Sequence, residues 1–308
     1  MRLNPRIPTK TNVARRKGRP LNGWLNIDKP EGLTSTQVIG RVRRLTQAAK
    51  IGHGGTLDPL ATGVLPIALG EATKTLPYVV DGDKEYAFTV AWGEERSTDD
   101  AEGEVVAESA SRPDRDAILA MLPRFIGVIE QVPPAFSAIK IDGQRAYDLS
   151  RRGETVELAA REVEIHDLQL LDATRDSARF VMTCGKGTYV RSLARDLARA
   201  LGTRGHVTEL RRMRVGPFRA AAAISLDKLE DMVHSAPPEQ ILLPVETALD
   251  GIPALAVTGG EAKRLQSGQV LHVPSRKTGV VQVKADDVLV ALAEIEHGEL
   301  RPLRVFNL

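Results

Sequence analysis

A glycine-rich segment with a single acid is the part of the chain whose residue types are best suited to chemistry. It runs Gly52-His53-Gly54-Gly55-Thr56-Leu57-Asp58-Pro59-Leu60-Ala61-Thr62-Gly63-Val64-Leu65-Pro66. Glycines give the backbone conformational freedom, and Pro59 favours an extended conformation at Asp58, so a loop of this kind can hold one carboxylate in a defined place. A phosphate-binding turn, or a helix–strand connection capped by Asp58, also fits the pattern. The Lys-Ser/Thr ending of a P-loop and the spacing of a dinucleotide-binding motif are absent from it.

The periodicity of apolar residues indicates which elements position this loop. Before it, Trp24–Ile27 predicts a short strand, and Ser35 is expected to cap a helix. After it, strict alternation predicts a strand with four side chains on one face, Tyr86, Phe88, Val90 and Trp92. Farther along, Arg179–Cys184 predicts another strand, and Tyr189–Leu201 predicts an amphipathic helix whose polar face carries Arg191, Arg195 and Arg199.

Charge is distributed unevenly along the chain, although the net charge is only +2. The first 25 residues carry seven basic residues and no acid, residues 81–116 carry twelve acids and four bases, and residues 191–219 carry eight arginines and two acids. The two basic blocks are either solvated surfaces or binding sites for a polyanion such as a nucleic acid.

Composition narrows the class of protein. The chain has 308 residues, 42% hydrophobic and 27% charged, which is ordinary for a globular protein and enough to bury a core without disulfides. No apolar run approaches the ~20 residues of a membrane helix, and the N-terminus has no apolar signal region, so we expect neither a membrane protein nor a secreted one. A lone cysteine, Cys184, excludes a disulfide framework and favours the cytoplasm.

Five further segments occur in a recognisable order around the glycine loop. They are residues 28–35 (DKPEGLTS), 83–86 (DKEY), 131–134 (QVPP), 137–140 (SAIK) and 184–191 (CGKGTYVR). Together with residues 52–66 they make the chain resemble the bacterial tRNA pseudouridine-55 synthases of the TruB family, in register from about Gly23 to Leu226. The specificity of this resemblance lies in several long segments that match in the order of the family.

The resemblance implies an α/β mixed (α+β) fold with a mostly antiparallel central sheet and a small, β-rich, PUA-like C-terminal domain. We expect a basic disordered arm over residues 1–22, a catalytic domain over 23–250 with an RNA-binding insertion at about 131–153, and the C-terminal domain over 251–308. It also implies a monomeric enzyme that acts on the T-arm of tRNA without a cofactor, a metal or an obligatory protein partner.

The implied reaction isomerises a uridine to pseudouridine by breaking the bond from C1′ to N1, rotating the uracil and rejoining it through C5. Asp58 aligns with the catalytic aspartate of the family, which attacks C1′ as a nucleophile or takes a ribose proton to give a glycal; the sequence leaves both open. By the same match Arg191 keeps this carboxylate ionised and oriented. Tyr86 stacks on the target uracil and is a candidate for removing the C5 proton, although alternation alone makes it a core residue.

Other residues receive roles from the resemblance alone. Tyr189 and Leu210 line the uracil pocket, and His53 helps to displace the target base from its stack. Lys29 supports the loop or contacts a phosphate. In the insertion, four bases suit phosphate contacts, Lys140, Arg145, Arg151 and Arg152.

Three rival interpretations follow from the residues. A glycoside hydrolase also attacks an anomeric carbon, but it usually needs a second catalytic carboxylate, which the motif segments do not offer. A metalloenzyme is disfavoured because the six histidines are scattered along the chain. A tRNA-binding folding chaperone without chemistry explains the basic blocks, and it makes the combination of Asp58, Tyr86 and Arg191 a coincidence.

Overall fold

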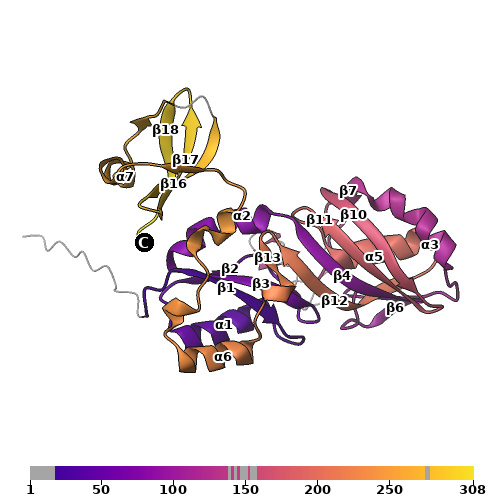
Figure 1. The fold of residues 1–308 in the computed structure, drawn as a ribbon. Coiled ribbons are helices and arrows are strands. Elements are labelled where there is room, and N and C mark those ends of the chain that lie inside the picture. The colour runs from indigo at the N-terminus through magenta and orange to yellow at the C-terminus, as the bar shows by residue number, and fades with distance from the viewer. Residues whose placement is uncertain (1–17, 138–139, 142–143, 146–151, 153–157, 275–277) are drawn as a thin grey trace, which may run out of the picture.

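The computed structural model describes residues 18–137, 140–141, 144–145, 152, 158–274 and 278–308. Within these residues the chain forms a nine-stranded sheet with helices packed around it and a five-stranded sheet close to the C-terminus (Figure 1). The expected fold class, a mixed α/β protein with a mostly antiparallel central sheet and a small β-rich C-terminal part, is confirmed.

The central sheet has the strand order β1-β3-β12-β4-β11-β10-β7, with β2 paired to β3 and β13 to β12. Its strands are β1 (Gly23–Lys29), β2 (Ile51–His53), β3 (Thr62–Leu69), β4 (Lys84–Trp92), β7 (Gly127–Gln131), β10 (Arg161–Ala173), β11 (Ser177–Cys184), β12 (Gly205–Val215) and β13 (Phe218–Arg219). Among the strand pairs described in this sheet, only β12 with β3 is parallel. That pair brings the end of the glycine loop against β12.

Helices cover the sheet in two groups. Figure 1 shows α1 (Ser35–Thr46) and α6 (Leu226–Ser235) side by side near β1, whereas α3 (Arg115–Met121) and α5 (Val190–Ala200) lie beside β10 and β4. The other helices in the described residues are α2 (Leu76–Asp81), α7 (Gly259–Gln266) and the 3-10 turns η1 (Gly70–Thr75), η2 (Leu122–Phe125), η3 (Ala220–Ala222), η4 (Pro238–Gln240) and η5 (Val245–Leu249). The expected helices at 35 and 190 are confirmed, but the capping residue of α1 is Thr34, whose side chain accepts a bond from Gln37 N.

Strand β4 follows the predicted alternation. Every second side chain from Lys84 to Trp92 is buried, including Tyr86, Phe88 and Val90. The ring of Phe88 stacks on that of Phe180 from β11, with 5.3 Å between their centroids. The same apolar cluster contains residues of α1 and α5, so the face of β4 that carries Tyr86 belongs to a core that both helices share.

The second sheet has the order β14-β16-β17-β18-β15. Its strands are β14 (Ala254–Ala256), β15 (Leu271–His272), β16 (Gly279–Ala285), β17 (Val288–Glu296) and β18 (Glu299–Val305). It contacts the central sheet through an apolar cluster in which Leu292 and Phe306 join Trp24 and Val64. Two short hairpins complete the described strands, β5 (Glu94–Arg96) with β6 (Val105–Glu108) and β8 (Lys140–Ile141) with β9 (Gln144–Arg145). In the described part of the chain, no helix is both long and apolar enough to cross a membrane.

Residues 18–22 belong to the folded part, so the expectation of a disordered arm up to residue 22 is wrong for them. Leu21 is buried in the main apolar cluster, and the backbone of Arg19 bonds to Gln47 and Ala49. The Arg19 side chain pairs with Glu239 at 2.8 Å. Residues 1–17 lie outside the described part of the chain.

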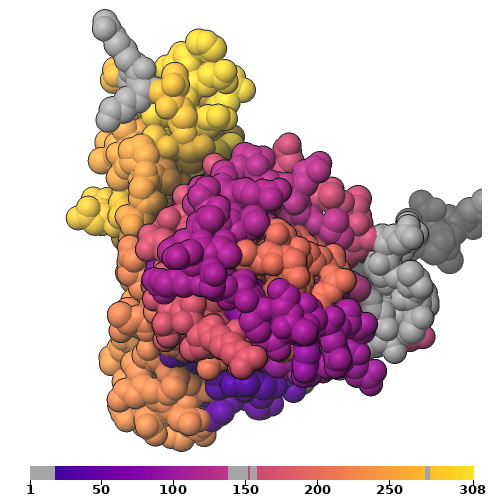
Figure 2. Space-filling model, turned by 90° about the vertical axis from the view of Figure 1, so that its right-hand side faces the viewer, coloured from indigo at the N-terminus to yellow at the C-terminus, as the bar shows by residue number. Residues whose placement is uncertain are grey.

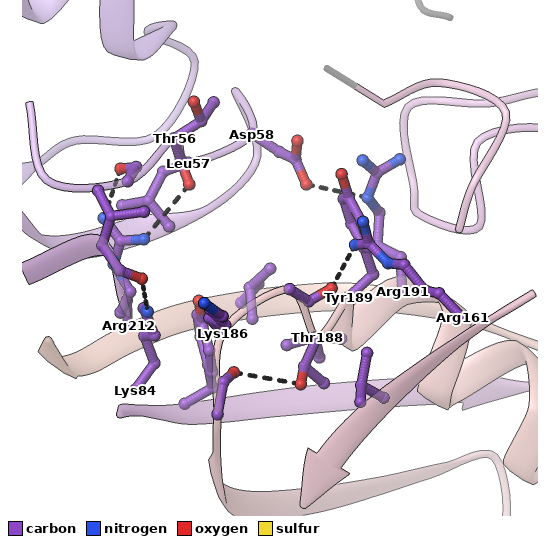
Figure 3. Close-up of a pocket in the computed structure, with 18 of the residues that line it drawn as sticks. Thr56, Leu57, Asp58, Lys84, Arg161, Lys186, Thr188, Tyr189, Arg191 and Arg212 are labelled. Atoms are coloured by element: carbon purple, nitrogen blue, oxygen red, sulfur yellow. Dashed lines mark hydrogen bonds and ion pairs between the residues drawn. The ribbon is translucent and has the colours of Figure 1, made fainter. Parts of the chain in front are cut away.

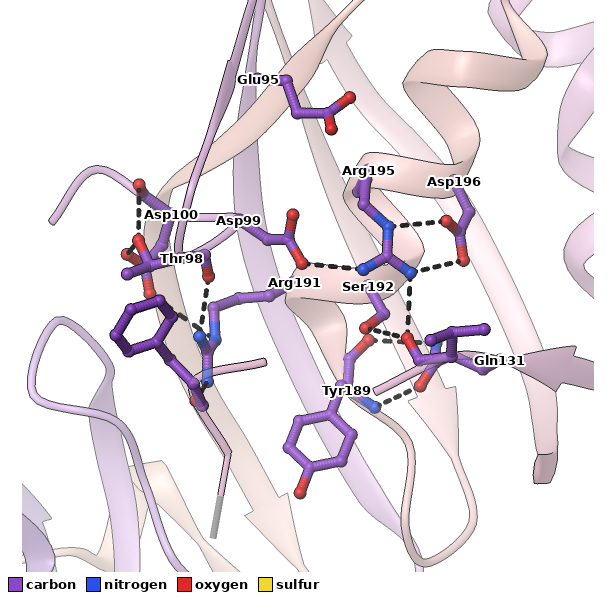
Figure 4. Close-up of polar contacts among 12 residues, drawn as sticks. Glu95, Thr98, Asp99, Asp100, Gln131, Tyr189, Arg191, Ser192, Arg195 and Asp196 are labelled. Atoms are coloured by element: carbon purple, nitrogen blue, oxygen red, sulfur yellow. Dashed lines mark hydrogen bonds and ion pairs between the residues drawn. The ribbon is translucent and has the colours of Figure 1, made fainter. Parts of the chain in front are cut away.

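The arginines of α5 do not form the free basic stripe that the sequence suggested. Arg191 pairs with Asp58 and Asp100, and Arg199 pairs with Glu95. Arg195 pairs with Asp99 and Asp196 (Figure 4). Figure 2 shows atoms from the end of α5 and the following turn (coral) surrounded by those of the acidic segment (purple to magenta). The acidic segment therefore neutralises the arginines of α5, and Arg191 and Arg195 need such partners because they are buried.

Burial of the Asp99–Arg195 pair leads to a first prediction. The pair joins Asp99 Oδ2 to Arg195 NH1 at 2.9 Å, and both side chains are at least nine-tenths buried. Burial raises the pKa of Asp99 to about 6, against the opposing effect of Arg195. We expect Arg195→Met to lower the free energy of unfolding at pH 7.5 by about 3 kcal/mol, because it leaves a buried carboxylate without its partner.

Urea unfolding measures this loss, and its pH dependence checks the cause. The pKa of Asp99 is higher in the folded state than in the unfolded state. At pH 5, between the two values, the folded protein therefore carries a protonated Asp99, which needs no cationic partner. The loss of unfolding free energy in Arg195→Met should accordingly be smaller at pH 5 than at pH 7.5. Arg199→Met is the matched control, because its side chain is about half exposed and its removal should cost less than about 1 kcal/mol. Equal losses in the two variants would contradict the prediction.

Candidate active site

A cavity of about 590 Å³ lies next to Asp58, where the glycine loop meets β4, β10, β12 and the start of α5 (Figure 3). The segments that line the cavity are far apart in the sequence, between residues 55 and 212, and the fold brings them together. They are Gly55–Asp58, Val80, Lys84, Tyr86, Arg161–Val163, Gly185–Arg191, Leu210 and Arg212.

The loop that carries Asp58 is fixed through its backbone. Ser35 Oγ accepts from Leu57 N at 2.9 Å and donates to Leu57 O at 3.1 Å. From the opposite side the guanidinium of Arg212 donates to the carbonyls of Gly55, Thr56 and Val64 at 3.0, 3.3 and 2.8 Å. The carbonyls of an irregular loop are thereby satisfied without water, as buried backbone groups require.

At one position of the motif, Gly63, only glycine fits sterically. Gly63 has a φ of +97°, and a Cβ atom added there would lie 2.3 Å from the carbonyl oxygen of Arg212. Any other residue would push β3 away from β12 at the only parallel pair described in the central sheet. Gly63 therefore allows the close approach that places Arg212 under the loop.

Lys29 is the third support of the loop. Its side chain is fully buried, and Nζ donates to the carbonyls of Pro30, Leu33 and Pro59 at 2.9, 2.6 and 3.0 Å. Burial lowers the pKa of Lys29 to about 8, although the nearby charge of Asp58 opposes the shift. Of the two roles expected for Lys29, this geometry agrees with support of the loop and not with a phosphate contact.

Asp58 faces a guanidinium that is shared with a second acid. Arg191 Nε lies 2.9 Å from Asp58 Oδ2 (Figure 3) and 3.5 Å from Asp100 Oδ2 (Figure 4). Neither contact has the direction of a hydrogen bond at Nε, so both are ion pairs. The other guanidinium nitrogens of Arg191 donate to the carbonyls of Thr98 and Phe136 at 2.8 and 3.0 Å.

Exposure distinguishes the two acids. The side chains of Arg191 and Asp100 are 4% and 2% exposed, whereas that of Asp58 is 32% exposed. Asp58 is therefore the one carboxylate of this group that a ligand in the cavity can reach. A positive charge with little water around it attracts a carboxylate more strongly than it would at the surface, so Arg191 holds Asp58 in place.

The structure brings Tyr86, Tyr189 and Leu210 to the same cavity as Asp58 and Arg191. Tyr86 lies on the buried face of β4, and burial raises the pKa of its phenol. Leu210 comes from β12 and Tyr189 from the residue before α5. The five residues expected to form the reaction centre and the uracil pocket, separated by up to 152 positions in the sequence, thus lie around one space.

Comparison with known proteins assigns the family. Residues 43–190 match the model of the TruB family pseudouridylate synthase N-terminal domain, and residues 191–250 match that of the tRNA pseudouridylate synthase B C-terminal domain. The chain belongs to the TruB family of pseudouridylate synthases. Enzymes of this family are isomerases.

Similar proteins extend the match to almost the whole chain. A tRNA pseudouridine synthase B of Bradyrhizobium diazoefficiens is 57% identical and that of Rhodospirillum rubrum is 56% identical, covering 97% and 96% of this chain and 90% and 99% of those proteins. Among solved structures, an H/ACA RNP bound to a substrate RNA containing 2′-deoxyuridine matches with a TM-score of 0.73 at 24% identity, covering 97% of this chain and 93% of that one. An archaeal box H/ACA sRNP Nop10–Cbf5 complex gives 0.71 at 25% identity, with coverages of 97% and 94%.

His53 lies at a second, smaller cavity on another side of Asp58. This cavity has a volume of about 250 Å³ and is also lined by Thr34–Thr36, Asp100, Phe136 and Ser137. Burial lowers the pKa of His53, so its imidazole is neutral at pH 7. The structure therefore separates His53 from the cavity of Tyr86 while keeping it beside Asp58.

The expected phosphate contacts lie mostly outside the described residues. Lys140 and Arg145 belong to β8 and β9, but the structure does not describe their side chains, and Arg151 is not described at all. Arg152 is described and exposed. The insertion also begins later than expected, because Gln131 is a buried residue of β7, only 1% exposed.

Sequence reasoning missed several residues of the site. Arg212 was counted in a basic surface, yet it is 1% exposed, while its neighbours Arg211 and Arg214 pair with Asp28 and Glu85. The alternation of β12 carried the signal, since Leu210 and Arg212 share one face of the strand. No sequence pattern pointed to Arg161 or Asp100. Only the folded chain brings Arg161 to Tyr189 and brings Asp100 to Arg191, the partner of Asp58.

Lys29 leads to a prediction about pH. Below a pH of about 8 its ammonium donates three hydrogen bonds, which tie the Asp58 loop at Pro59 to Pro30 and Leu33, and above that pH it loses one of these donors. We expect kcat/KM to be level up to about pH 8 and to fall above it. Lys29→Met should be less active at every pH and should lack this alkaline limb. Lys74→Met, which removes another carbonyl-bound ammonium outside the cavity lining, should keep it. If kcat/KM of Lys29→Met still fell above pH 8, a group other than Lys29 would cause the fall.

Proposed function

We propose that this protein isomerises the uridine at position 55, in the T-loop of tRNA, to pseudouridine through Asp58, and that the target base is flipped out of its stack. The observation that carries the proposal is the ion pair of a part-exposed Asp58 with the buried Arg191 at the edge of a cavity of about 590 Å³. The relatives named tRNA pseudouridine synthase B support tRNA as the substrate.

Two chemical routes are open to the carboxylate of Asp58, and both use the same geometry. It attacks C1′ with departure of N1, or it accepts a proton from the ribose while N1 departs, which gives a glycal. Each route needs an ionised oxygen that faces the substrate. Arg191 contacts Oδ2 of Asp58, which leaves the other oxygen for the ribose.

Tyr86 would contact the uracil as a neutral phenol. Because burial raises the pKa of Tyr86, the phenol keeps its proton at pH 7, with Arg212 partly opposing the shift. A neutral phenol stacks on a base without placing a charge against it, and it accepts the C5 proton only if its own proton leaves at the same time. The stacking role is therefore the one that the geometry supports better.

The remaining parts of the proposal concern the complex with RNA. His53, neutral and beside Asp58, suits an uncharged side chain that replaces a flipped base, which also carries no charge. Arg152 and the bases at 140, 145 and 151 are proposed phosphate contacts of the RNA-binding insertion. We also propose that the enzyme acts as a monomer in the cytoplasm.

Substitution of the carboxylate tests the proposal directly. We expect Asp58→Asn to lower pseudouridine formation on an unmodified tRNA transcript by at least about 10³-fold while tRNA affinity changes less than about threefold, since the amide neither attacks nor accepts a proton. Product mapped to each nucleotide gives the position. Asp28→Asn is the matched control, because Asp28 also pairs with an arginine, has a 31% exposed side chain and lies outside the cavity lining.

Three results would contradict this proposal. Near-normal turnover by Asp58→Asn would remove the catalytic assignment, and product at another uridine would remove the T-loop assignment. Tight tRNA binding without product from the wild type would favour the folding chaperone.

Asp100 leads to a separate prediction about the orientation of Arg191. Its buried carboxylate lies 3.5 Å from Arg191 Nε and accepts a hydrogen bond from Thr98 Oγ1. We expect Asp100→Asn to lower kcat by about tenfold or more without changing tRNA affinity. The reason is that Arg191 loses an ion pair that helps to fix the orientation of its guanidinium. Single-turnover kinetics measure the effect. Asp99→Asn is the control, since Asp99 pairs with Arg195 instead; an equal fall in both variants would contradict a specific role of Asp100.

A further inference from the structure

Tyr189, on the wall of the cavity, is held through its backbone by one side chain. Gln131 Nε2 donates to Tyr189 O at 3.1 Å, and Tyr189 N donates to Gln131 Oε1 at 2.8 Å (Figure 4). The primary amide of Gln131 therefore matches both polar groups of one peptide residue. A side chain that is only 1% exposed and makes two complementary bonds has a fixed orientation.

A second side chain holds the ring of the same residue. The guanidinium carbon of Arg161 lies 5.0 Å from the centroid of the Tyr189 ring, at cation–π distance, and NH2 of Arg161 donates to the carbonyl of Gly187. Arg161 and Gln131 are direct partners in the pairing of β10 with β7. One cross-strand pair thus contacts Tyr189 at its backbone and at its ring.

The held residue is also the start of α5. Tyr189 is the N-cap residue of this helix, and its own side chain makes no capping hydrogen bond. Arg191, which pairs with Asp58, follows two residues later in the first turn. A shift of Tyr189 would therefore displace the wall of the cavity and the partner of Asp58 together.

We propose that Gln131 and Arg161 are positioning residues for the reaction: Gln131 fixes the place of Tyr189 and the first turn of α5, and Arg161 fixes the plane of the Tyr189 ring. The substrate of this reaction rests on the proposed function, whereas the placement of Tyr189 does not. Because the pair acts through Tyr189 and the start of α5, it should change the rate of the chemical step and leave tRNA affinity almost unchanged.

Gln131→Glu tests the first half of the proposal, because it keeps the shape and one acceptor but loses the donor. At pH 8 the carboxylate would face the carbonyl of Tyr189, and we expect a fall in single-turnover rate of about tenfold or more with a tRNA dissociation constant within about twofold of wild type. Burial raises the pKa of a glutamate at this position, so its protonated form regains a donor at lower pH. The ratio of variant to wild-type rate should therefore rise between pH 8 and pH 6.

Arg161→Lys tests the second half and keeps the charge while losing the planar group. Its position is only partly buried, so the variant should fold, and we expect its rate to fall by about threefold or more. Incorporation of 3-fluorotyrosine gives a direct readout by ¹⁹F NMR, because the chain has four tyrosines and Tyr189→Phe assigns the signal. Both variants should shift the Tyr189 signal.

Ser192→Ala is the matched control. The hydroxyl of Ser192 donates to the carbonyl of Val132 at 2.8 Å, so the variant removes a buried bond between the same two segments without touching Tyr189. The rate of Ser192→Ala should stay within about twofold of the wild-type rate, and its Tyr189 signal should not shift. A wild-type rate and signal in Gln131→Glu, or equal losses in Ser192→Ala, would overturn the proposal. If the wild type forms no pseudouridine, the proposed function fails, and the ¹⁹F signals still decide whether the pair positions Tyr189.

Discussion

The buried guanidinium of Arg191 is the interaction on which the site depends. Its charge is balanced by Asp58 and Asp100, and its remaining donors bind the carbonyls of Thr98 and Phe136. A charge with so little exposure is stable only when its partners are all in place. Four distant segments, the glycine loop, the acidic segment, the chain after β7 and helix α5, are therefore fixed relative to one another by a single side chain.

The same requirement explains the unusual charge pattern of the chain. The acids of residues 94–100 supply the partners of three arginines on α5, so the two blocks are two halves of one network. Of the two acids that Arg191 contacts, only Asp58, at the cavity, has a part-exposed side chain. The network thus stabilises the fold and leaves one oxygen-bearing group available for chemistry, which a patch of free surface charges would not achieve.

The sequence predicts those parts of the site that depend on local patterns. The glycine loop, the strand with Tyr86 and the helix that begins near residue 190 follow from residue types and periodicity, and motif resemblance identified Asp58 and Arg191. The misjudged residues are the long cationic ones. Lys29 and Arg212 are fully buried under the loop, where backbone carbonyls take the place of water, and no pattern of charge along the chain reveals such an environment. Arginines on α5 were misjudged for the related reason that their partners lie about 100 residues away.

The catalytic role proposed for Asp58 also depends on the contacts that hold its loop in place. In the reaction proposed for Asp58, one acid acts on a ribose–uracil substrate, so its rate depends mainly on holding both in the right geometry. In this fold the loop of Asp58 is held by Lys29, Ser35 and Arg212 below it, and the opposite wall is held at Tyr189 by Gln131 and Arg161. Almost all of these bonds end on backbone atoms, which cannot rotate away. The two walls are therefore held in place where they line the cavity, which is the geometry that the proposed reaction requires.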